Sequence, residues 1–377
     1  MKILHISKYY YPYIGGVENT CKYLVDSFSK ENDVAVVCFN EGKEDMCDEI
    51  NGVRIYRVGS RITIARQALS LSYFPILRKA INEFQPDIIH FHWANPYPAA
   101  VLLTMIPRKV KLVIHWHMDI INQRKIYPLI KPVETTLLKR ADRIMVTSPN
   151  YRDFSKPLQS FKEKIDIVQS AIDESLFIKH PQDDARIKEI HEKYDNKPII
   201  FFVGRHIKYK GLPYLLEAER YVNSDCVFVI AGNGPLTEKL KSSCHSSRVN
   251  FIGKVSDDDL RCYLYASRVL AFPSITKNEA FGLSLTQGMY CRLPAVTFTI
   301  EGSGVNWVSI KDKTCLEVSN GDTIAYARAI DKLINDATLH DRFAEAGYKR
   351  AKDLFVLPKE IEACKKCYEK SLHTKCL

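Results

Sequence analysis

Short, nearly continuous apolar runs alternate with amphipathic stretches along most of this chain, and this alternation limits the possible folds more than any other feature. In the first half the runs cover residues 2–6, 34–39, 88–91, 112–115 and 144–146, and in the second half 199–203, 227–230, 249–252, 269–272 and 295–298. Buried parallel strands have this continuous apolar character, and helical spacing between them favours strand–helix units. The sequence therefore predicts an α/β protein with two doubly wound, Rossmann-like parallel sheets.

The chain has 377 residues, which is long for one domain, since domains usually hold about 100–200 residues. The alternation pauses at residues 170–181, where polar residues and a proline follow the apolar run 165–168. We therefore predict one domain at 1–171, a second at 172–355, and a carboxyl-terminal helix at 356–377. One face of that helix is apolar, so it should dock on an apolar surface, and the first domain is one candidate. That face carries Ile361, Cys364, Tyr368 and Leu372.

The composition is that of a water-soluble globular protein, with 46% hydrophobic and 26% charged residues. No apolar run approaches the roughly 18 residues that a membrane-spanning helix needs, and the apolar start is too short for a signal peptide. Eleven cysteines without a secretion signal indicate reduced thiols rather than a disulfide framework. These features predict a cytoplasmic protein that is soluble or peripheral to a membrane.

Ligands of open parallel sheets bind beyond the carboxyl ends of the strands, so the loops at those ends hold the candidate residues. In the first half, Gly15 and Gly16 lead from a strand into a helix, and their backbone amides can approach a phosphate or a sugar. A plain tight turn is the alternative. His117 follows the fourth strand, with Asp119 two residues later, and is a candidate although a lone histidine is more often structural.

In the second half, the loop 204–211 carries Arg205 and Lys210 after a strand. An arginine can fork two phosphate oxygens and a lysine can add a point charge, so the loop suits a diphosphate, with a solvated basic loop as the alternative. In the loop 273–283, Glu279 precedes a helix that begins near Gly282. Its carboxylate can accept sugar hydroxyls while the free helix amides face an anion, or the loop can be a simple helix cap.

Several other functions lack support in the sequence. Neither Gly232-Asn233-Gly234 nor Gly302-Ser303-Gly304 continues as a dinucleotide fingerprint, and there is no phosphate loop of the nucleotide triphosphate enzymes. Cysteine and histidine near the carboxyl end have the residue types of a zinc site, but on a continuous helix Cys364 belongs to the apolar face. These residues are Cys364, Cys367, His373 and Cys376. We therefore predict no metal site and no bound cofactor.

Taken together and in order, these motifs resemble those of the retaining glycosyltransferases of family 4, and the resemblance covers nearly the whole chain. The matching segments are 8–18, 116–120, the loop with Arg205 and Lys210, and 279–282. The resemblance implies the GT-B fold, in which two Rossmann-like domains face each other across a cleft. It also implies transfer of a hexose from a UDP- or GDP-linked sugar to an acceptor hydroxyl, with retained configuration and without a metal. The sequence has no Asp-x-Asp motif of the kind that metal-dependent glycosyltransferases use. The acidic run 257–259 fits the capped start of a helix instead.

The same resemblance assigns roles to the candidate residues. His117 lines the donor-sugar pocket, Glu279 positions sugar hydroxyls, and Arg205 and Lys210 neutralise the departing diphosphate, as fixed cationic groups do when charge develops on a leaving group. The remaining donor-binding positions are Gly15, Gly16, Phe281, Gly282, Leu283 and Gln287.

Gln287 departs from the family pattern, which has a second glutamate eight positions after the first to hold the nucleotide ribose. A glutamine carbonyl still accepts a hydroxyl hydrogen, but less strongly than a carboxylate. A catalytically degenerate protein that only binds sugars or a partner therefore stays open as an alternative. A sugar-nucleotide epimerase on the same fold is another.

The segment 302–307 is similar to one in family members that build bacterial surface polysaccharide, such as lipopolysaccharide O-antigen or capsule. This implies a lipid-linked oligosaccharide acceptor at the cytoplasmic face of the inner membrane. The chain carries a net charge of +10, and most of the excess precedes Ile172, where Lys and Arg number 24 and Asp and Glu 17. No nucleic-acid motif accompanies this charge.

Residues 50–82 are basic, contain no acidic residue and are interleaved with apolar side chains. The basic residues are Arg54, Arg57, Arg61, Arg66, Arg78 and Lys79, and the apolar ones Ile62, Ile64, Leu69, Leu71, Tyr73 and Phe74. Such a stretch suits an anionic membrane surface, and a solvated helix face is the alternative.

Overall fold

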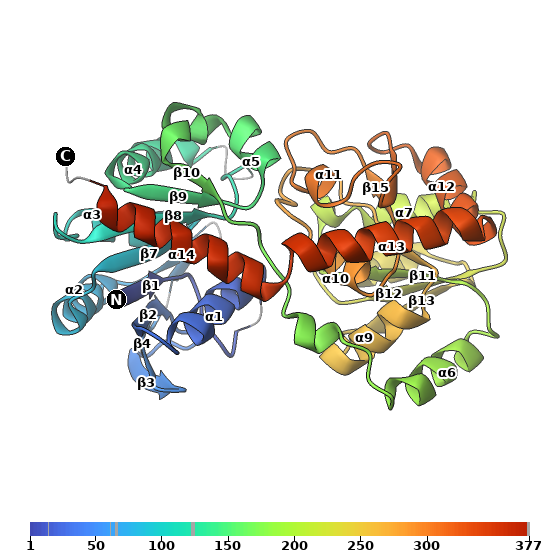
Figure 1. Cartoon of the computed structure of the whole chain (residues 1–377), viewed down its shortest axis with the longest axis horizontal. Helices are drawn as coiled ribbons and strands as arrows, with labels where there is room; N and C mark the ends of the chain where they lie inside the picture. Colours follow the sequence, from blue (N-terminus) through green and yellow to red (C-terminus); the bar gives the residue numbers. More distant parts are fainter. Residues whose placement is uncertain (14, 61, 65–66, 122–124, 375–377) are drawn as a thin grey trace. The chain divides into compact units, whose positions relative to one another are not determined.

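The computed structural model describes residues 1–13, 15–60, 62–64, 67–121 and 125–374, which form two compact units (Figure 1). Unit 1 contains Met1–Ser170 together with Glu360–Leu377, and unit 2 contains Ala171–Lys359. Among the described residues, no helix is both long and apolar enough to cross a membrane. Every cysteine in these residues is a free thiol.

Unit 1 is built on an eight-stranded sheet in the order β10-β9-β8-β7-β1-β2-β4-β3, in which only β3 is antiparallel to its neighbour. Its strands are β1 (Lys2–Ile6), β2 (Asp33–Phe39), β3 (Met46–Ile50), β4 (Val53–Val58), β7 (Ile88–Trp93), β8 (Lys111–Trp116), β9 (Arg143–Val146) and β10 (Ile165–Ile167). A separate hairpin consists of β5 (Ile62–Ile64) and β6 (Gln67–Leu69). The central strands are buried along almost their whole length, as their continuous apolar runs predict.

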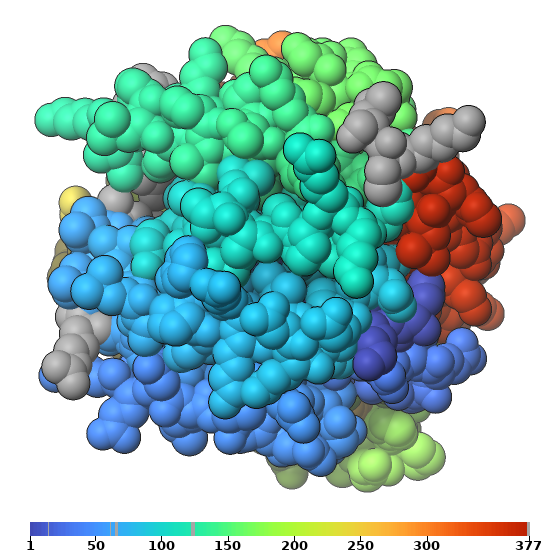
Figure 2. All heavy atoms as spheres, turned by 90° about the vertical axis from the view of Figure 1, so that its left-hand side faces the viewer, coloured from blue at the N-terminus to red at the C-terminus, as the bar shows by residue number. Residues whose placement is uncertain are grey.

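The helices of unit 1 follow its strands in the expected alternation. They are α1 (Gly16–Phe28), α2 (Tyr73–Phe84), α3 (Pro96–Leu103), α4 (Tyr127–Arg140) and α5 (Pro149–Phe154), with a 3-10 segment η1 (Lys156–Lys164). The last helix of the chain, α14 (Leu357–His373), also belongs here from Glu360 onward. Its red atoms border the dark-blue amino-terminal residues in Figure 2.

Helix α14 is held on unit 1 by its apolar face. Cys364, Cys367 and Tyr368 are buried in the same core as α1 and the central strands. At the rim of this contact, the Lys370 ammonium lies 2.6 Å from a carboxylate oxygen of Asp166. The cysteine pair is therefore part of a hydrophobic core, and Cys376, the last residue considered for zinc, lies outside the described residues.

Unit 2 has a six-stranded, fully parallel sheet in the order β13-β12-β11-β14-β15-β16. The strands are β11 (Ile199–Val203), β12 (Val227–Ala231), β13 (Val249–Gly253), β14 (Val269–Phe272), β15 (Ala295–Phe298) and β16 (Cys315–Val318). The order reverses at β11 and β14, and ligands of such sheets bind beyond the strand ends at this point.

The helices of unit 2 surround this sheet. They are α6 (Asp183–Lys193), α7 (Leu212–Glu219), α8 (Thr237–Ser243), α9 (Asp257–Ala266), α10 (Leu283–Tyr290), α11 (Val305–Val308), α12 (Thr323–Asn335) and α13 (Ala337–Leu354), with 3-10 turns η2 (Glu174–Phe177) and η3 (Lys208–Lys210). Ser256 caps α9 by accepting a hydrogen bond from the amide of Asp259. The acidic run 257–259 is thus a capped helix start, as predicted.

The basic stretch 50–82 does not form a single helix face. It runs through β4, the β5–β6 hairpin and most of α2. Arg57 is only 7% exposed, and its guanidinium bonds the Asp48 carboxylate at 3.1 Å and the Tyr11 carbonyl at 2.6 Å. Tyr73 is buried in the core, so neither Arg57 nor Tyr73 is available to contact a membrane surface. Arg61 and Arg66 lie outside the described residues.

Candidate functional site

In unit 2, a buried ion pair joins the two loops that the sequence singled out. The Lys210 ammonium lies 2.6 Å from Oε2 of Glu279, and both side chains are largely enclosed. Burial alone would lower the pKa of Lys210, but the Glu279 carboxylate and the nearby Tyr209 outweigh it, so this pKa is raised. Lys210 therefore stays cationic beside the Glu279 side chain at the strand-order reversal.

The loop after β11 brings Lys210 to Glu279 because its backbone packs directly against the loop that follows β14. Gly211 has φ +69°, and a Cβ there would come within 1.8 Å of the Pro273 carbonyl oxygen. The amide of Ile275 donates to the Tyr209 carbonyl at 2.9 Å, which ties the Lys210 loop to the Glu279 loop. A side chain at position 211 would therefore force the Lys210 loop and the Glu279 loop apart.

The Gly232-Asn233-Gly234 segment, which failed as a dinucleotide fingerprint, has a packing role. A Cβ on Gly232 would lie 2.0 Å from the Gly204 carbonyl oxygen. The amide of His206 donates to the Asn233 carbonyl at 3.0 Å, and the His206 ring bonds the Thr237 hydroxyl at 2.9 Å. These contacts brace the basic loop from the side of β12.

Arg205 differs from Lys210 in its surroundings. Its side chain is exposed and forms no ion pair or hydrogen bond with any residue in the described part of the chain. A free guanidinium at the carboxyl end of β11 can receive a bidentate anion such as a phosphate.

Two serines support Glu279, and sequence reasoning missed both. The Ser274 hydroxyl donates to Oε2 of Glu279 at 2.9 Å. The Ser303 hydroxyl donates to the Glu279 carbonyl and accepts from the amide of Val305 at 3.1 Å. Ser274 lies in the same loop as Glu279, but Ser303 comes from the Gly302-Ser303-Gly304 segment, whose polar small residues were the available signal.

Helix α10 begins directly after this loop. Gly282 is its N-cap with φ +98°, a conformation that favours glycine, and Leu283 is its first residue. The half-buried Gln287 lies one turn further on. Phe281 is buried against Trp307 and Phe355, with ring centroids 6.3 and 5.4 Å apart, so its ring packs in the core and its backbone is the part left to contact a donor.

In unit 1, Gly15 and Gly16 precede and open α1, and a Cβ on Gly16 would meet no atom within 4 Å. The backbone here is open to an approaching group. His117 lies one residue beyond β8 and keeps 6% of its surface exposed. Its ring bonds His92 rather than Asp119, whose carboxylate accepts from the Trp116 indole at 3.0 Å and the Ser155 hydroxyl at 2.6 Å.

His117 belongs to a cluster of buried histidines on three adjacent strands, which the sequence pattern did not predict. His5 lies on β1, His90 and His92 on β7, and His115 on β8. Burial lowers the pKa of His5 and His115 to about 3, with a further lowering at His5 from His115. Burial also lowers the pKa values of His90, His92 and His117 well below the ordinary value. All of these rings are therefore neutral at physiological pH.

One nitrogen from each of His90, His92 and His115 lies within 4.8 Å of the others. The ring planes of His90 and His92 are 21° apart, those of His92 and His115 25°, and those of His90 and His115 45°. His5, Cys21 and His92 form a second group of this kind. Within the cluster the imidazoles contact one another.

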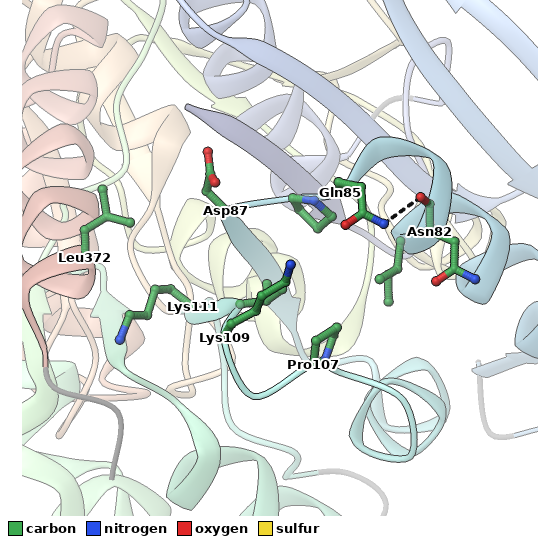
Figure 3. Close-up of a pocket in the computed structure, with 10 residues that line it drawn as sticks. Asn82, Gln85, Asp87, Pro107, Lys109, Lys111 and Leu372 are labelled. Carbon is green, nitrogen blue, oxygen red and sulfur yellow. Dashed lines mark hydrogen bonds between the residues drawn. The ribbon is translucent and has the colours of Figure 1, made fainter.

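A hollow of about 250 Å³ lies at the amino-terminal ends of the central strands of unit 1 (Figure 3). Asp87 and Lys111, which line it, stand at the amino ends of β7 and β8. His117 follows the carboxyl end of β8, so this hollow is separate from the predicted site.

Comparison with known proteins identifies the class. Residues 14–176 match the model of Glycosyltransferase Family 4, and residues 183–350 match that of Glycosyl transferases group 1. The chain belongs to this family of glycosyltransferases.

Two curated relatives span nearly the whole chain. D-rhamnosyltransferase WbpZ of Pseudomonas aeruginosa is 30% identical over 359 residues, which are 93% of this chain and 92% of that protein. O-antigen chain mannosyltransferase C of Escherichia coli is 27% identical over 385 residues, covering both chains completely.

The fold of this chain is also similar to folds seen in solved structures. Anabaena Alr3699/HepE, in complex with UDP and glucose, superposes with a TM-score of 0.78 over 98% of this chain and 99% of that chain, at 18% identity. The predicted GT-B fold class is therefore confirmed.

Proposed function

We propose that this glycosyltransferase transfers a hexose, with retention of configuration and without a metal ion, from a UDP- or GDP-linked sugar to a lipid-linked saccharide. The product would be part of a lipopolysaccharide O-antigen, a capsule or an exopolysaccharide. The named relatives, a mannosyltransferase and a D-rhamnosyltransferase, support a hexose or deoxyhexose donor. The UDP complex of a protein with this fold supports a nucleotide sugar.

The ion pair of Lys210 with Glu279, next to the free Arg205, is the observation that carries this proposal. Negative charge grows on the diphosphate as the glycosidic bond breaks. A cationic side chain that is already fixed in place stabilises that charge without reorganisation, which favours the transition state over the ground state. Arg205 adds a planar fork for two phosphate oxygens, and the Glu279 carboxylate orients sugar hydroxyls.

The first backbone amides of α10 extend this cradle. An anion near them is favoured because the first turn of a helix has unpaired N–H groups and a partial positive charge. Gln287 lies one turn into the same helix and would hold the ribose through its neutral carbonyl. His117, Gly15 and Gly16, which belong to unit 1, are proposed to bind the donor as well.

We also propose that the enzyme is cytoplasmic and peripheral at the cytoplasmic face of the inner membrane. The support is the exposure of apolar side chains within the basic stretch, since Leu71 is 95% exposed and Ile62, Ile64 and Phe74 are exposed as well. Apolar side chains among arginines suit an anionic lipid surface. Co-sedimentation with anionic vesicles that persists unchanged in a Leu71→Ser, Phe74→Ser variant would count against this docking.

Purified protein should release UDP or GDP when it is given its donor and a polyprenyl-linked acceptor. Lys210→Ala should abolish most of this release, whereas Lys208→Ala should not, because Lys208 is an exposed neighbour in the same turn. The anomeric configuration of the product, read by NMR, tests retention, and a preparation treated with a chelator tests metal independence.

The alternatives separate in the same experiment. An epimerase would convert the donor with no acceptor present. A degenerate binding protein, for which Gln287 is the sequence support, would bind nucleotide without turnover.

A further inference from the structure

The histidine cluster of unit 1 contains a hydrogen-bonded row of three rings. Nδ1 of His5 lies 3.2 Å from Nε2 of His92, and Nδ1 of His92 lies 2.9 Å from Nε2 of His117. The ring centroids are 5.5 and 5.2 Å apart and the planes differ by 27° and 6°, so the rings meet edge to edge. This row begins in the core at His5 and ends at His117, the most exposed of its members.

Two more histidines cover the faces of this row. His90 stacks on His92 with ring centroids 4.5 Å apart, and His115 stacks on His117 at 4.1 Å. His90 is fixed in turn by α14, because its Nδ1 lies 2.5 Å from the Tyr368 hydroxyl. The row therefore has little freedom to rotate its rings and exchange bonding partners.

Neutral imidazole has one N–H and one nitrogen lone pair, which couples the tautomers along the row. If His5 donates from Nδ1, His92 accepts at Nε2 and must donate from its own Nδ1, so His117 accepts at Nε2 and carries its proton on Nδ1. If the direction is reversed, all three rings carry the proton on Nε2. The row thus has two neutral states, all Nδ1–H or all Nε2–H.

The core end of the row decides between these states. Nε2 of His5 is enclosed and has no hydrogen-bond partner among the described residues. The all-Nε2–H state would place an N–H there, and enclosed N–H groups without an acceptor are rarely tolerated. In the all-Nδ1–H state that atom is a lone pair instead.

We infer that His5 and His92 are positioning residues that hold His117 in its Nδ1–H tautomer. His117 then presents a hydrogen-bond donor from Nδ1 and cannot accept a proton there. Resting on the proposed function, this makes His117 a donor to an oxygen of the nucleotide-linked sugar rather than a general base. Because Nε2 of His5, at the end of the row, has no hydrogen-bond partner within the described part of the chain, the row orients His117 and does not conduct protons away from it.

The tautomers can be read without any activity assay. In long-range proton–nitrogen NMR spectra of the full chain with ¹⁵N-labelled histidine, the cross-peak patterns of the two neutral tautomers differ. His5, His92 and His117 should each show a single Nδ1–H form at neutral pH. An Nε2–H form at His117, or a mixture, would overturn the inference.

A matched pair of variants tests the coupling. His92 and His115 face each other across β7 and β8, but only His92 is in the row. His92→Phe should release His117 into a mixture of tautomers, while His115→Phe should leave its spectrum in the Nδ1–H form. Equal effects of the two variants would contradict the positioning role. If His92→Phe does not fold, the test uses the wild-type spectrum and a second pair of variants at His5. His5→Leu should release His117 into a mixture of tautomers, whereas His5→Asn, which can keep a donor near the Nδ1 position, should preserve the Nδ1–H form.

Kinetics then link the row to the proposed reaction. If the two tautomers of His117 became equally populated, the competent fraction would halve, so kcat/KM should fall about two-fold in His5→Leu and recover in His5→Asn. His117→Asn, which keeps a donor near Nδ1, should retain more kcat/KM than His117→Gln. If the wild-type protein and all variants were inactive, the proposed function would be refuted. The NMR spectra would still test whether the histidine row fixes the tautomer of His117.

Discussion

Lowering the pH from 7 to 5 should destabilise unit 1 through its buried histidines. The pKa of His5 and of His115 is about 3 in the folded protein against 6.5 for an ordinary histidine. Between these values the unfolded chain binds protons that the folded protein does not, so stability rises with pH in this window and is unaffected well above pH 7. For each of these two histidines the linkage relation gives a loss of about 2 kcal/mol on going from pH 7 to pH 5.

One carboxyl group opposes this loss. Burial raises the pKa of Glu134 to about 7 from 4.5, with Asp119 adding to the rise. The folded protein therefore binds a proton here that the unfolded chain does not, which stabilises it by about 2 kcal/mol over the same interval. Two histidines against one glutamate leave a net loss of about 2 kcal/mol, and the lowered pKa values of His90, His92 and His117 increase it. That is a large part of a domain stability of about 5–15 kcal/mol.

Tryptophan emission can follow unit 1 alone. The chain has 3 tryptophans, and Trp93 and Trp116 stack in the core of unit 1 at 5.1 Å, whereas Trp307 is in unit 2. In a Trp307→Phe background, urea unfolding at pH 7, 6 and 5 gives the free energy of unfolding of unit 1 at each pH.

Variants identify the groups responsible. His115→Phe should flatten the pH dependence by about 2 kcal/mol over this interval, and Glu134→Gln should steepen it by about the same amount. His373→Gln, which changes an exposed histidine of α14, should leave it unaltered. A free energy of unfolding that is constant from pH 7 to 5, or a His373→Gln effect equal to that of His115→Phe, would refute this reasoning.

Three further predictions concern unit 2. Lys210→Met leaves the Glu279 carboxylate buried without its partner, so the free energy of unfolding should fall by about 3 kcal/mol and kcat by about 10²-fold. Denaturant titration measures the stability and nucleotide release measures kcat. A variant that is as stable and active as the wild type would contradict the ion-pair role. Gly211→Ala places a Cβ against the Pro273 carbonyl, so it should weaken nucleotide binding in calorimetry; unchanged binding would show that the loop can adapt. Ser303→Ala removes a hydrogen bond to the Glu279 backbone, so the free energy of unfolding measured by thermal denaturation should fall by about 1 kcal/mol. An unchanged free energy would show that this hydrogen bond does not stabilise the loop.

The sequence predicted elements best where burial on both faces makes a strand continuously apolar. β1, β11, β14 and β15 have the bounds expected from their runs. β3, β4, the β5–β6 hairpin and β16 were missed. Exposed or charged residues break the apolar runs of β3 and β4, as Arg54 and Arg57 do in β4, β5 is exposed along its length, and Glu317 interrupts the apolar residues of β16. Pattern alone does not separate such strands from loops.

The site residues show a different limit. Lys210 and Glu279 were each placed at a strand end, but their contact is a tertiary fact that depends on the close approach at Gly211. The histidine row was visible only as the spacings His90-x-His92 and His115-x-His117, which put each pair on one face of a strand. Which strands are neighbours, and therefore that His5 meets His92, follows from the sheet order and not from spacing.

We propose that this chain uses a nucleotide diphosphate sugar as a glycosyl donor through the Lys210 and Glu279 pair. The most direct measurement is release of UDP or GDP from a panel of nucleotide sugars, with a polyprenyl-linked saccharide as acceptor, by wild-type protein, Lys210→Ala, Glu279→Ala and the control Lys208→Ala. We expect the wild-type protein to release nucleotide from one donor only when the acceptor is present. This release should be lost in Lys210→Ala and Glu279→Ala and kept in Lys208→Ala. Release that is equal in all four proteins, or no release from any donor despite nucleotide binding, would contradict it.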